Sequence, residues 1–486
     1  MISFIRNRSL LRVSVAASAL CSVPATAQSP SRTELEARVH QLEDAVARLE
    51  ARLARSDVSP IASPVPTSDA SVVQVANVPS GTAKAFSTSR QTVPPTPDGF
   101  VAERPRDVTA TPGRDGFTVD GTTVRLTGQF KTVAASSRYS GGAMPTESIG
   151  RDFYSPAFIP VGDPVGSHDT ELGAKQTRLT ISTATPIGNH ELKGLLEMDF
   201  QVTPGTQANQ RVVNGYNPGL RRAFLTYGRF LAGQEFTTWQ YLPALPETTD
   251  FVGPAEGTVF ARQAQFRYTQ PLSSTLSLAA AVENPETVYA TVAAPVTISS
   301  GSDPVPDFAT RLNWKPGFGE FSLGGVVRRL TVGTATGDAH AFGWGVSLAG
   351  KVPFGGGRYN DARFMMTAGD GVGRYVGFAL VPDAILAPTA GVLKPVELTA
   401  GFAAVRIGLF GTVRSSLAYS FQNGRYVEGY RPLLDTKSAW SGAFNVFVTP
   451  FEDFDVGVEY RHGNRAINNG SSGNLDRSEL SVRYTF

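Results

Sequence analysis

The chain ends in ELSVRYTF, residues 479–486. Leu480, Val482, Tyr484 and Phe486 alternate with polar residues, so in an extended strand the apolar side chains share one face and the polar ones the other. A strand with one apolar and one polar face occurs both in soluble β-sandwiches and in membrane barrels. The ending therefore predicts a two-faced β-strand, and the rest of the sequence has to decide between the two architectures.

The same alternation recurs from Phe117 to the end of the chain. It is clear in the stretches 124–131, 192–200, 275–283, 308–315, 342–348, 361–367 and 455–461. About sixteen such segments fit into residues 116–486, at roughly 23 residues for each strand with its loop, which suits strands of about ten residues. We therefore predict an all-β fold, a 16-stranded antiparallel transmembrane β-barrel over residues 116–486. A barrel of this size leaves a water-filled channel, which the polar faces would line.

The composition agrees with a β-protein and excludes some partners. The 486 residues include 49 Gly and 33 Pro, which disfavour long helices. The formal net charge of +2 provides no general positive field, so we expect no nucleic-acid partner. Arginine outnumbers lysine by 36 to 8, which favours fixed guanidinium groups over flexible ammonium groups.

Residues 1–27 resemble a secretory signal peptide. They contain several arginines, then a short apolar stretch, and end in Ala25-Thr26-Ala27. Cys21, the only cysteine, would instead be a lipid acceptor in a lipoprotein, but Leu20 before it is larger than such sites normally have. After the signal no apolar run reaches the roughly 18 residues of a helical span, so only a closed barrel could cross a membrane. We expect an exported chain without disulfides.

Residues 28–55 are predicted to form a short coiled coil. Apolar residues recur at spacings of four and three, as in a heptad seam. The six core positions are Leu35, Val39, Leu42, Val46, Leu49 and Leu53. The expected partner is another copy of the chain, and the alternative is an amphipathic helix packed on its own domain. Residues 56–115, rich in Pro, Ser and Thr, are predicted to be a disordered linker.

Basic residues are frequent on the predicted polar faces. The candidate lumen-lining residues are Arg125, Lys131, Arg178, Arg363 and Arg414. Guanidinium groups bind carboxylate and phosphate in bidentate fashion, so this pattern favours the passage of anions. The opposing interpretation is that lumenal Glu and Asp residues balance most of these charges, which would leave little selectivity.

Several stretches resemble the DcaP-like porins. They are residues 219–228, 231–234, 246–251, 260–268 and 414–419, and the resemblance also includes the coiled coil. It implies a trimeric 16-stranded porin of the bacterial outer membrane, with a periplasmic N-terminal helix, that takes up dicarboxylic acids through an arginine-bearing constriction. The constriction candidates are Arg222, Arg262, Arg267 and Arg311, with Glu247 and Asp250 facing them from the third loop. The alternation leaves open whether Arg221 or Arg222 faces the lumen.

The resemblance also implies that Tyr484 and Phe486 form the assembly signal of the terminal strand. The sequence contains no nucleophile-elbow, zinc-protease or phosphate-loop motif, and its five His are scattered. We expect no catalytic residues, no metal and no cofactor. The predicted function is passive diffusion of small hydrophilic anions, with dicarboxylates the first choice. The alternatives are a phosphate or polyphosphate porin and a structural envelope tether whose coil contacts the cell wall.

Overall fold

The computed structural model describes part of the chain, and all described residues belong to one unit, Thr92–Phe486. The described residues are 116–146, 148–201, 216–292, 297–301, 303–335, 337–387 and 391–486. The predicted signal peptide, coiled coil and linker, with the core positions Leu35 to Leu53, lie outside the described residues.

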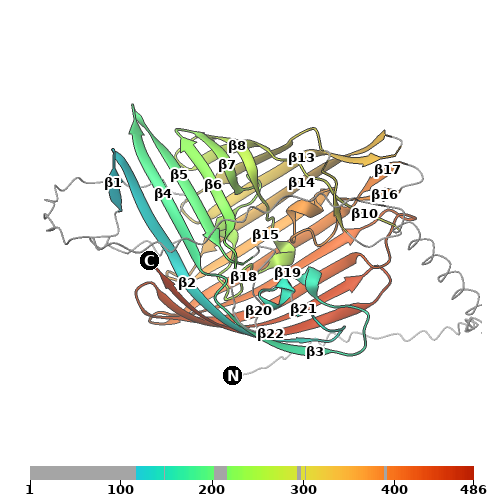
Figure 1. Ribbon diagram of the computed structural model, residues 1–486. Coiled ribbons are helices and arrows are strands. Elements are labelled where there is room, and N and C mark those ends of the chain that lie inside the picture. The colour runs from blue at the N-terminus through green and yellow to red at the C-terminus, as the bar shows by residue number, and fades with distance from the viewer. Residues whose placement is uncertain are drawn as a thin grey trace, which may run out of the picture. The chain divides into compact units, whose positions relative to one another are not determined.

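Eighteen strands form one antiparallel sheet, and Figure 1 shows them tilted side by side. They are β1 (Phe117–Val119), β2 (Thr122–Tyr139), β3 (Ser167–Gly173), β4 (Arg178–Ile187), β5 (His190–Asp199), β6 (Gly219–Tyr227), β7 (Phe230–Phe236), β8 (Arg262–Pro271), β9 (Leu276–Glu283), β12 (Asp307–Trp314), β13 (Glu320–Thr334), β14 (Gly337–Pro353), β15 (Asp361–Asp370), β18 (Glu397–Phe410), β19 (Val413–Arg425), β20 (Thr436–Phe451), β21 (Phe454–Ile467) and β22 (Ser472–Thr485).

The sheet closes on itself because β2 pairs with the last strand and with the strands that follow it. One edge of β2 pairs with β22, with Phe130 opposite Tyr484. The other edge pairs with β4 along its first part and with β3 along its second part. Since β3 and β4 share one position and β1 is only a short arm on β2, the described strands form a 16-stranded antiparallel barrel. The predicted fold class is confirmed for this part of the chain.

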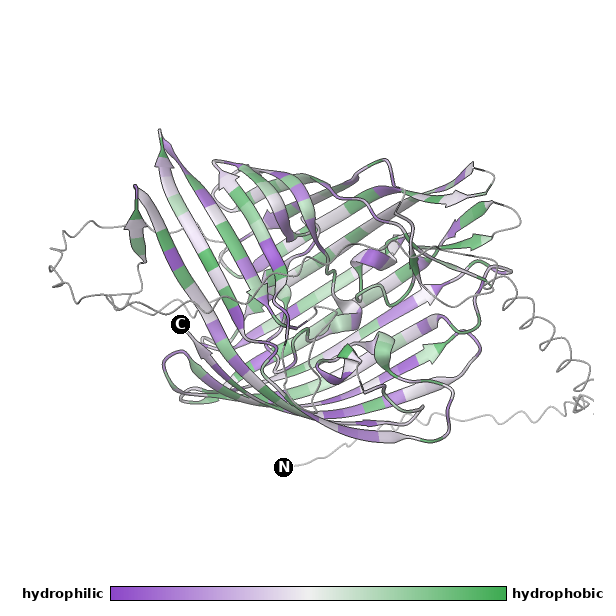
Figure 2. Ribbon diagram, in the orientation of Figure 1, coloured by the Kyte–Doolittle hydropathy of each residue, from purple (hydrophilic) through white to green (hydrophobic). Residues whose placement is uncertain are grey.

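The predicted alternation also appears in the structure, and Figure 2 shows it as alternating colours along the strands. On β22, Leu480, Val482 and Tyr484 are exposed on the outer face, whereas Glu479 and Ser481 are buried on the inner face. A closed barrel leaves no unpaired strand edge, and an apolar outer face can be solvated by lipid. The pleat thus directs these polar residues of β22 to the lumen.

The two ends of the barrel differ in the length of their connections. At one end, tight turns such as Gly188-Asn189 and Glu452-Asp453 join neighbouring strands. At the other end, long connections carry the short 3-10 helices η1 (Ile149–Arg151), η2 (Pro156–Phe158), η3 (Leu242–Ala244), η4 (Ala255–Gly257) and η5 (Gly373–Tyr375). A small second sheet at that end contains β11 (Ile298–Ser299), β10 (Val288–Thr291), β16 (Ala384–Ala387) and β17 (Val392–Pro395). Within the described ranges, no helix has the length and apolar character needed to span a membrane.

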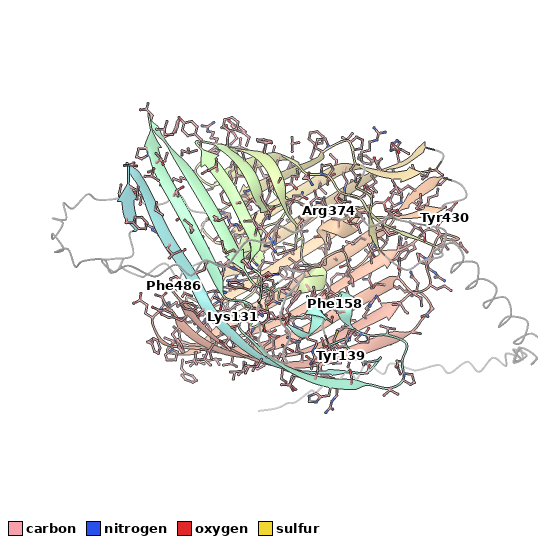
Figure 3. The ribbon with its side chains drawn as sticks, viewed as in Figure 1. Lys131, Tyr139, Phe158, Arg374, Tyr430 and Phe486 are labelled. Carbon is pink, nitrogen blue, oxygen red and sulfur yellow. The ribbon has the colours of Figure 1, made fainter. Side chains whose placement is uncertain are left out.

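The last residue is tied to the first long strand. The Phe486 N–H donates to the Gly128 carbonyl and the Gly128 N–H donates to the Phe486 carbonyl, both at 3.0 Å. The Phe486 ring lies against Phe130, with the ring centroids 5.1 Å apart. Figure 3 shows Phe486 at the end of the barrel where the chain terminates. The terminal residue thus belongs to the seam that closes the barrel.

Deleting Phe486, or changing it to Asp, is expected to leave most of the protein unassembled in cells. The change removes an apolar ring and two backbone hydrogen bonds from the closing seam, or places a charge there. The measurement is the fraction of protein whose gel mobility changes on boiling. The control is Phe410→Asp, since Phe410 is 74% exposed on the outer face of β18. Equal losses in the two variants would show that Phe486 acts only as a lipid-facing aromatic residue.

Candidate functional site

A long loop between β7 and β8, residues 237–261, folds into the barrel instead of leaving it. Its η3 contacts β14 and β15, and its η4 contacts β18, β19 and β20. Trp239 is fully buried at the start of the loop and packs on Gly324 and Gly345, where a side chain would collide with the indole. We call residues 237–261 the inner loop. It crosses from its own strands to the opposite wall and so narrows the lumen.

An ion pair of Glu247 and three hydrogen bonds of Thr249 hold the middle of the inner loop. The Arg414 guanidinium donates to both carboxylate oxygens of Glu247, at 2.7 and 2.6 Å. Two residues on, Thr249 donates from its N–H to Glu459 and from its hydroxyl to Glu479, both at 3.0 Å. Its carbonyl accepts from Lys131 Nζ at 2.7 Å. Lys131 lies part-way along β2 in Figure 3, whereas Glu459 and Glu479 lie on β21 and β22. The first long strand and the last two strands therefore anchor this part of the loop together.

The other two loop carboxylates also point at protein groups. Asp250 Oδ1 accepts from the Tyr154 N–H at 2.6 Å, and Asp250 Oδ2 accepts from Val252 and Gly253. Glu256 accepts from the Tyr154 hydroxyl, and its other oxygen accepts from Ser441 at 3.2 Å. Burial, reinforced by the Glu256 charge, raises the pKa of Tyr154 well above its usual range. The phenol therefore remains a proton donor to Glu256.

A second segment of the long-loop end, residues 371–387 and 391–396, packs on the inner loop. The Phe260 N–H donates to the Tyr375 carbonyl at 2.7 Å, and the Gly377 N–H donates to the Thr258 carbonyl at 3.1 Å. The Tyr375 hydroxyl donates to Asp307 at 2.8 Å. Burial raises the pKa of Tyr375 well above its usual range, so it too stays protonated. The inner loop is thus held by a neighbouring loop as well as by the wall.

Buried ions fix this second segment. Asp383 accepts from the backbone N–H groups of Val288 and Arg374, at 2.9 and 2.8 Å. Its ion pair with Arg328 measures 3.0 Å, and both side chains are fully buried. Burial raises the pKa of Asp383, an effect that Arg328 opposes. Arg374, labelled in Figure 3, also contacts Asp307 at 3.4 Å.

Six guanidinium groups lie on the wall from which the inner loop starts, on strands between β4 and β12. We call them the basic arc: Arg178 on β4, Arg221 and Arg222 on β6, Arg262 and Arg267 on β8, and Arg311 on β12. Both neighbouring arginines of β6 point inward because the pairing shifts by one residue between Glu197 and Met198. Such a β-bulge inserts one extra residue, so alternation fails locally. Of the two arginines, the alternation predicted only one in the lumen, but both Arg221 and Arg222 face it.

Carboxylates on neighbouring strands neutralise half of the basic arc. Arg221 lies 2.8 Å from Glu197 and 2.5 Å from Asp199. Arg222 forms a bidentate pair with Glu235, at 2.8 and 2.6 Å. Arg178 lies 3.6 Å from Asp199 and 4.0 Å from Glu197. Neighbouring carboxylates therefore balance the charges of these three guanidinium groups.

The remaining three arginines of the basic arc form no ion pair with any residue of the described ranges. Arg267 donates to the Thr238 hydroxyl and to the Phe236 carbonyl, both at 2.7 Å, and Arg311 donates to the Gln240 carbonyl. The Arg262 guanidinium lies over the rings of Phe236 and Phe260, 5.9 and 5.6 Å from their centroids. All three side chains are half-buried. Their charges remain available to a solute.

The predicted site residues thus fall into different environments. Arg262, Arg267 and Arg311 are unpaired on the basic arc, whereas Arg222 and Arg178 are paired there. Arg363 and Arg414 lie on the opposite wall, and each holds the inner loop, Arg363 through the Leu245 carbonyl. Glu247 and Asp250 do not face the arginines as expected, because Arg414 and Tyr154 engage them. Arg125 is half-buried on the inner face of β2, near the short-turn end.

Sequence reasoning missed the residues that position the inner loop. Trp239, Tyr154 and Tyr375 each lie outside an alternating strand, so no periodic signal marked them. Over the described ranges no cluster of His, Cys, Asp and Glu could hold a metal ion. The arrangement is a narrowed lumen with a charged wall.

Comparisons with known proteins agree on the architecture. A family model described as "DcaP outer membrane protein" matches residues 114–486. The crystal structure of the outer membrane channel DcaP of Acinetobacter baumannii has a TM-score of 0.62 at 21% identity, over 76% of this chain and 99% of that chain. The anion-selective porin from Comamonas acidovorans has a TM-score of 0.47 at 10% identity, over 75% of this chain and 100% of that chain. OmpT of Vibrio cholerae, folded in vitro, has a TM-score of 0.46 at 13% identity, over 76% and 100% of the two chains. No curated protein sequence matches the chain.

Proposed function

Because the chain belongs to the DcaP outer membrane protein family and is an outer-membrane porin, we propose that it favours small hydrophilic anions, dicarboxylates first among them. The solutes would pass by diffusion, without a cofactor and without a chemical step. The inner loop and the basic arc would form the constriction. Phosphate or polyphosphate is the alternative cargo, since guanidinium groups bind both kinds of anion.

One observation carries the proposal: the unpaired charges of the constriction are positive. Arg262, Arg267 and Arg311 have no carboxylate partner among the described residues, whereas every carboxylate of the inner loop is engaged by the wall or by another loop. The carboxylates adjoining the basic arc are Glu197, Asp199, Glu235 and Glu283. Six guanidinium groups thus stand beside four carboxylates. In a narrow, low-dielectric passage this excess concentrates anions.

Two neighbouring unpaired arginines suit a solute with a carboxylate at each end. Arg267 and Arg311 lie close enough to interact electrostatically, and they sit on different strands. A dianion could contact both, with each contact contributing about 1 kcal/mol in this wet site. Binding of that strength permits release, which a channel requires.

The test is the reversal potential of the purified full chain in planar bilayers with competing salts. With potassium succinate on one side and potassium phosphate on the other, we expect the potential to report a higher permeability for succinate. Succinate should also interrupt chloride current at millimolar concentration, and less in high salt because screening weakens the contacts. A higher phosphate permeability would favour the alternative cargo, and a cation preference would overturn the proposal.

We propose further that the porin is a homotrimer whose copies meet at the outer face of β2, β3, β21 and β22. This face carries a group of polar side chains beside its exposed apolar residues Phe130, Leu480 and Tyr484. The Tyr460 hydroxyl donates to Asp476 at 2.6 Å, and His462 Nδ1 lies 2.8 Å from the same carboxylate. On the neighbouring strands Ser136 and His168 are 2.9 Å apart. A carboxylate that faces lipid is unfavourable, although less so than Arg or Lys, and a partner barrel would remove that cost.

The N-terminal region would lie in the periplasm. The predicted coiled coil of residues 28–55 would join the copies, and the same coil would be the part that contacts the cell wall. A chain lacking residues 28–110 should keep its pore, since the barrel satisfies its own backbone hydrogen bonds. Its oligomer should dissociate at a lower temperature than that of the full chain, measured by gel mobility after graded heating. Unchanged thermal dissociation would argue that the coil serves as an envelope tether.

A further inference from the structure

We propose that Phe260, supported by Phe378, is a positioning residue that holds the Arg262 guanidinium in the path of a passing carboxylate. Arg262 differs from the other two unpaired arginines of the basic arc. Arg267 and Arg311 donate hydrogen bonds to the inner loop, whereas within the described ranges aromatic rings alone hold the Arg262 guanidinium. The inference rests on the proposed anion preference, and it names what keeps one of the free charges in place.

Two rings form a corner around the Arg262 guanidinium. The rings of Phe236 and Phe260 stand at 71° to each other, with their centroids 5.6 Å apart. The guanidinium carbon lies 5.9 Å from the first centroid and 5.6 Å from the second. A guanidinium over an aromatic face is attracted by the quadrupole of the ring. Because the rings offer no oxygen acceptor, the N–H donors of Arg262 stay available for a carboxylate.

The pleat of β8 does not by itself direct Arg262 to the lumen. Arg262 falls on the same side of the alternation as Ala264 and Phe266, which are exposed on the outer face. Its charge nevertheless interacts with that of Arg221, which points inward, and this interaction is repulsive. Asp199 attracts Arg262, but it is already paired with Arg221 at 2.5 Å. The two rings therefore supply a contact that keeps the guanidinium on the lumenal side.

A strained segment of the neighbouring loop holds a third ring against Phe260. Gly377, Phe378 and Ala379 have φ angles of 64°, 58° and 56°. Three consecutive left-handed residues are unusual, because this conformation is sterically unfavourable for any residue with a side chain. The Phe378 ring lies on the Phe260 ring, with the centroids 4.4 Å apart and the planes at 25°. A bulky residue in a strained conformation indicates that its ring has a function there.

The pairing of the two loops explains why the left-handed residues are needed. The inner loop and the neighbouring segment pair antiparallel at Val259 and Val376. Continued pairing would place Phe378 opposite Gly257, three residues away from Phe260. The left-handed residues end the pairing and return the Phe378 ring to Phe260. The backbone is thus bent at a steric cost, and the result is a ring that backs Phe260.

The experiment measures how long succinate interrupts the current of the purified full chain in planar bilayers. Phe260→Leu keeps an apolar side chain but removes the ring, so the residence time should shorten about three- to tenfold. Phe260→Tyr keeps the ring and should retain the residence time within about twofold. Phe378→Leu removes only the supporting ring and should shorten it about two- to threefold. Equal residence in wild type and in Phe260→Leu would overturn the proposal.

A positioning role requires that the Phe260 ring act through Arg262. In a channel that already carries Arg262→Ala, adding Phe260→Leu should therefore change the residence time by less than about twofold. A shortening in this background as large as in the wild-type background would overturn the proposal. The ring would then act on the solute directly or on the packing of the loop.

Phe158→Leu is the matched control for loop packing. Phe158, labelled in Figure 3, is half-buried and packs on the same buried cluster as Phe378, but it lies over no arginine of the described residues. Its replacement should leave the residence time unchanged. A shortening equal to that in Phe378→Leu would overturn the role of Phe378. Heat-dependent gel mobility shows whether each variant is folded.

Failure of the proposed function is seen separately in the same bilayers. A cation preference in the reversal potential would overturn the anion preference, while the residence times would still test the rings. A residence time that Arg262→Ala shortens and Phe260→Leu does not would overturn this inference alone. The absence of any interruption by succinate would overturn both proposals.

Discussion

A channel carrying Arg262→Ala, Arg267→Ala and Arg311→Ala together is expected to change from anion-preferring to cation-preferring. The three guanidinium groups are the unpaired positive charges of the basic arc among the described residues. Without them, three arginines would remain beside four carboxylates, so the charge excess at the constriction changes sign. Fields in a narrow passage with low-dielectric walls outweigh charges in wider parts of the lumen. The reversal potential across a gradient of potassium chloride at low ionic strength should change sign.

The matched control is Arg483→Ala. Arg483 also faces the lumen, but it lies near the terminal end of β22 and is paired with Asp455 at 2.5 Å. Its removal should leave the sign of the reversal potential unchanged. A wild-type channel that prefers cations, or an equal shift from Arg483→Ala and from the triple variant, would show that the selectivity filter lies elsewhere in the lumen.

Changing Gly345 to Leu is expected to displace the inner loop and to alter the conductance severalfold. Even a Cβ atom at Gly345 would collide with the Trp239 ring, and a Cβ at Gly324 would lie 2.7 Å from another atom of the same ring. Trp239 is fully buried, and overpacking a filled core typically costs 1–3 kcal/mol. The indole, which anchors the start of the inner loop, would have to leave its socket. The measurement is single-channel conductance together with its open-state fluctuations.

Two further variants distinguish this mechanism from general damage to a strand. Gly442→Leu places the same side chain on β20 at a position with no atom within 4 Å of the added Cβ, so its conductance should equal that of wild type. Trp239→Ala combined with Gly345→Leu removes the collision and should recover part of the wild-type conductance. Normal conductance in Gly345→Leu alone would show that Trp239 does not hold the inner loop.

The physical basis of these two predictions differs in how far the sequence could anticipate it. Arg262, Arg267 and Arg311 were candidates from the sequence, because charged residues on a polar face and a family resemblance both indicated them. Their freedom from carboxylates could not be anticipated. Arg222 was also a constriction candidate from the sequence, but in the structure it is paired with Glu235, a residue of the next strand. No pattern in the sequence marked Trp239 or the two glycines on which it packs, because the contact joins a loop to strand positions 85 and 106 residues further along the chain.

The bulge in β6 illustrates a local limit of the same kind. Alternation assigns one of two adjacent arginines to the lumen, but a shift of pairing between β5 and β6 turns both inward. The shift depends on how two strands align, and neither strand contains that information by itself.

The sequence alone determined that this chain alternates apolar and polar residues along many strands, that an aromatic residue, Phe486, follows the last strand, and that a closed barrel with a polar lumen results. It could do so because the direction of a strand side chain follows from the pleat, whose period of two residues is a local property. Only the tertiary structure decided which lumenal charges remain free. Glu247 meets Arg414 across 167 residues of sequence, and such pairs depend on strand register and on the path of the inner loop through the barrel.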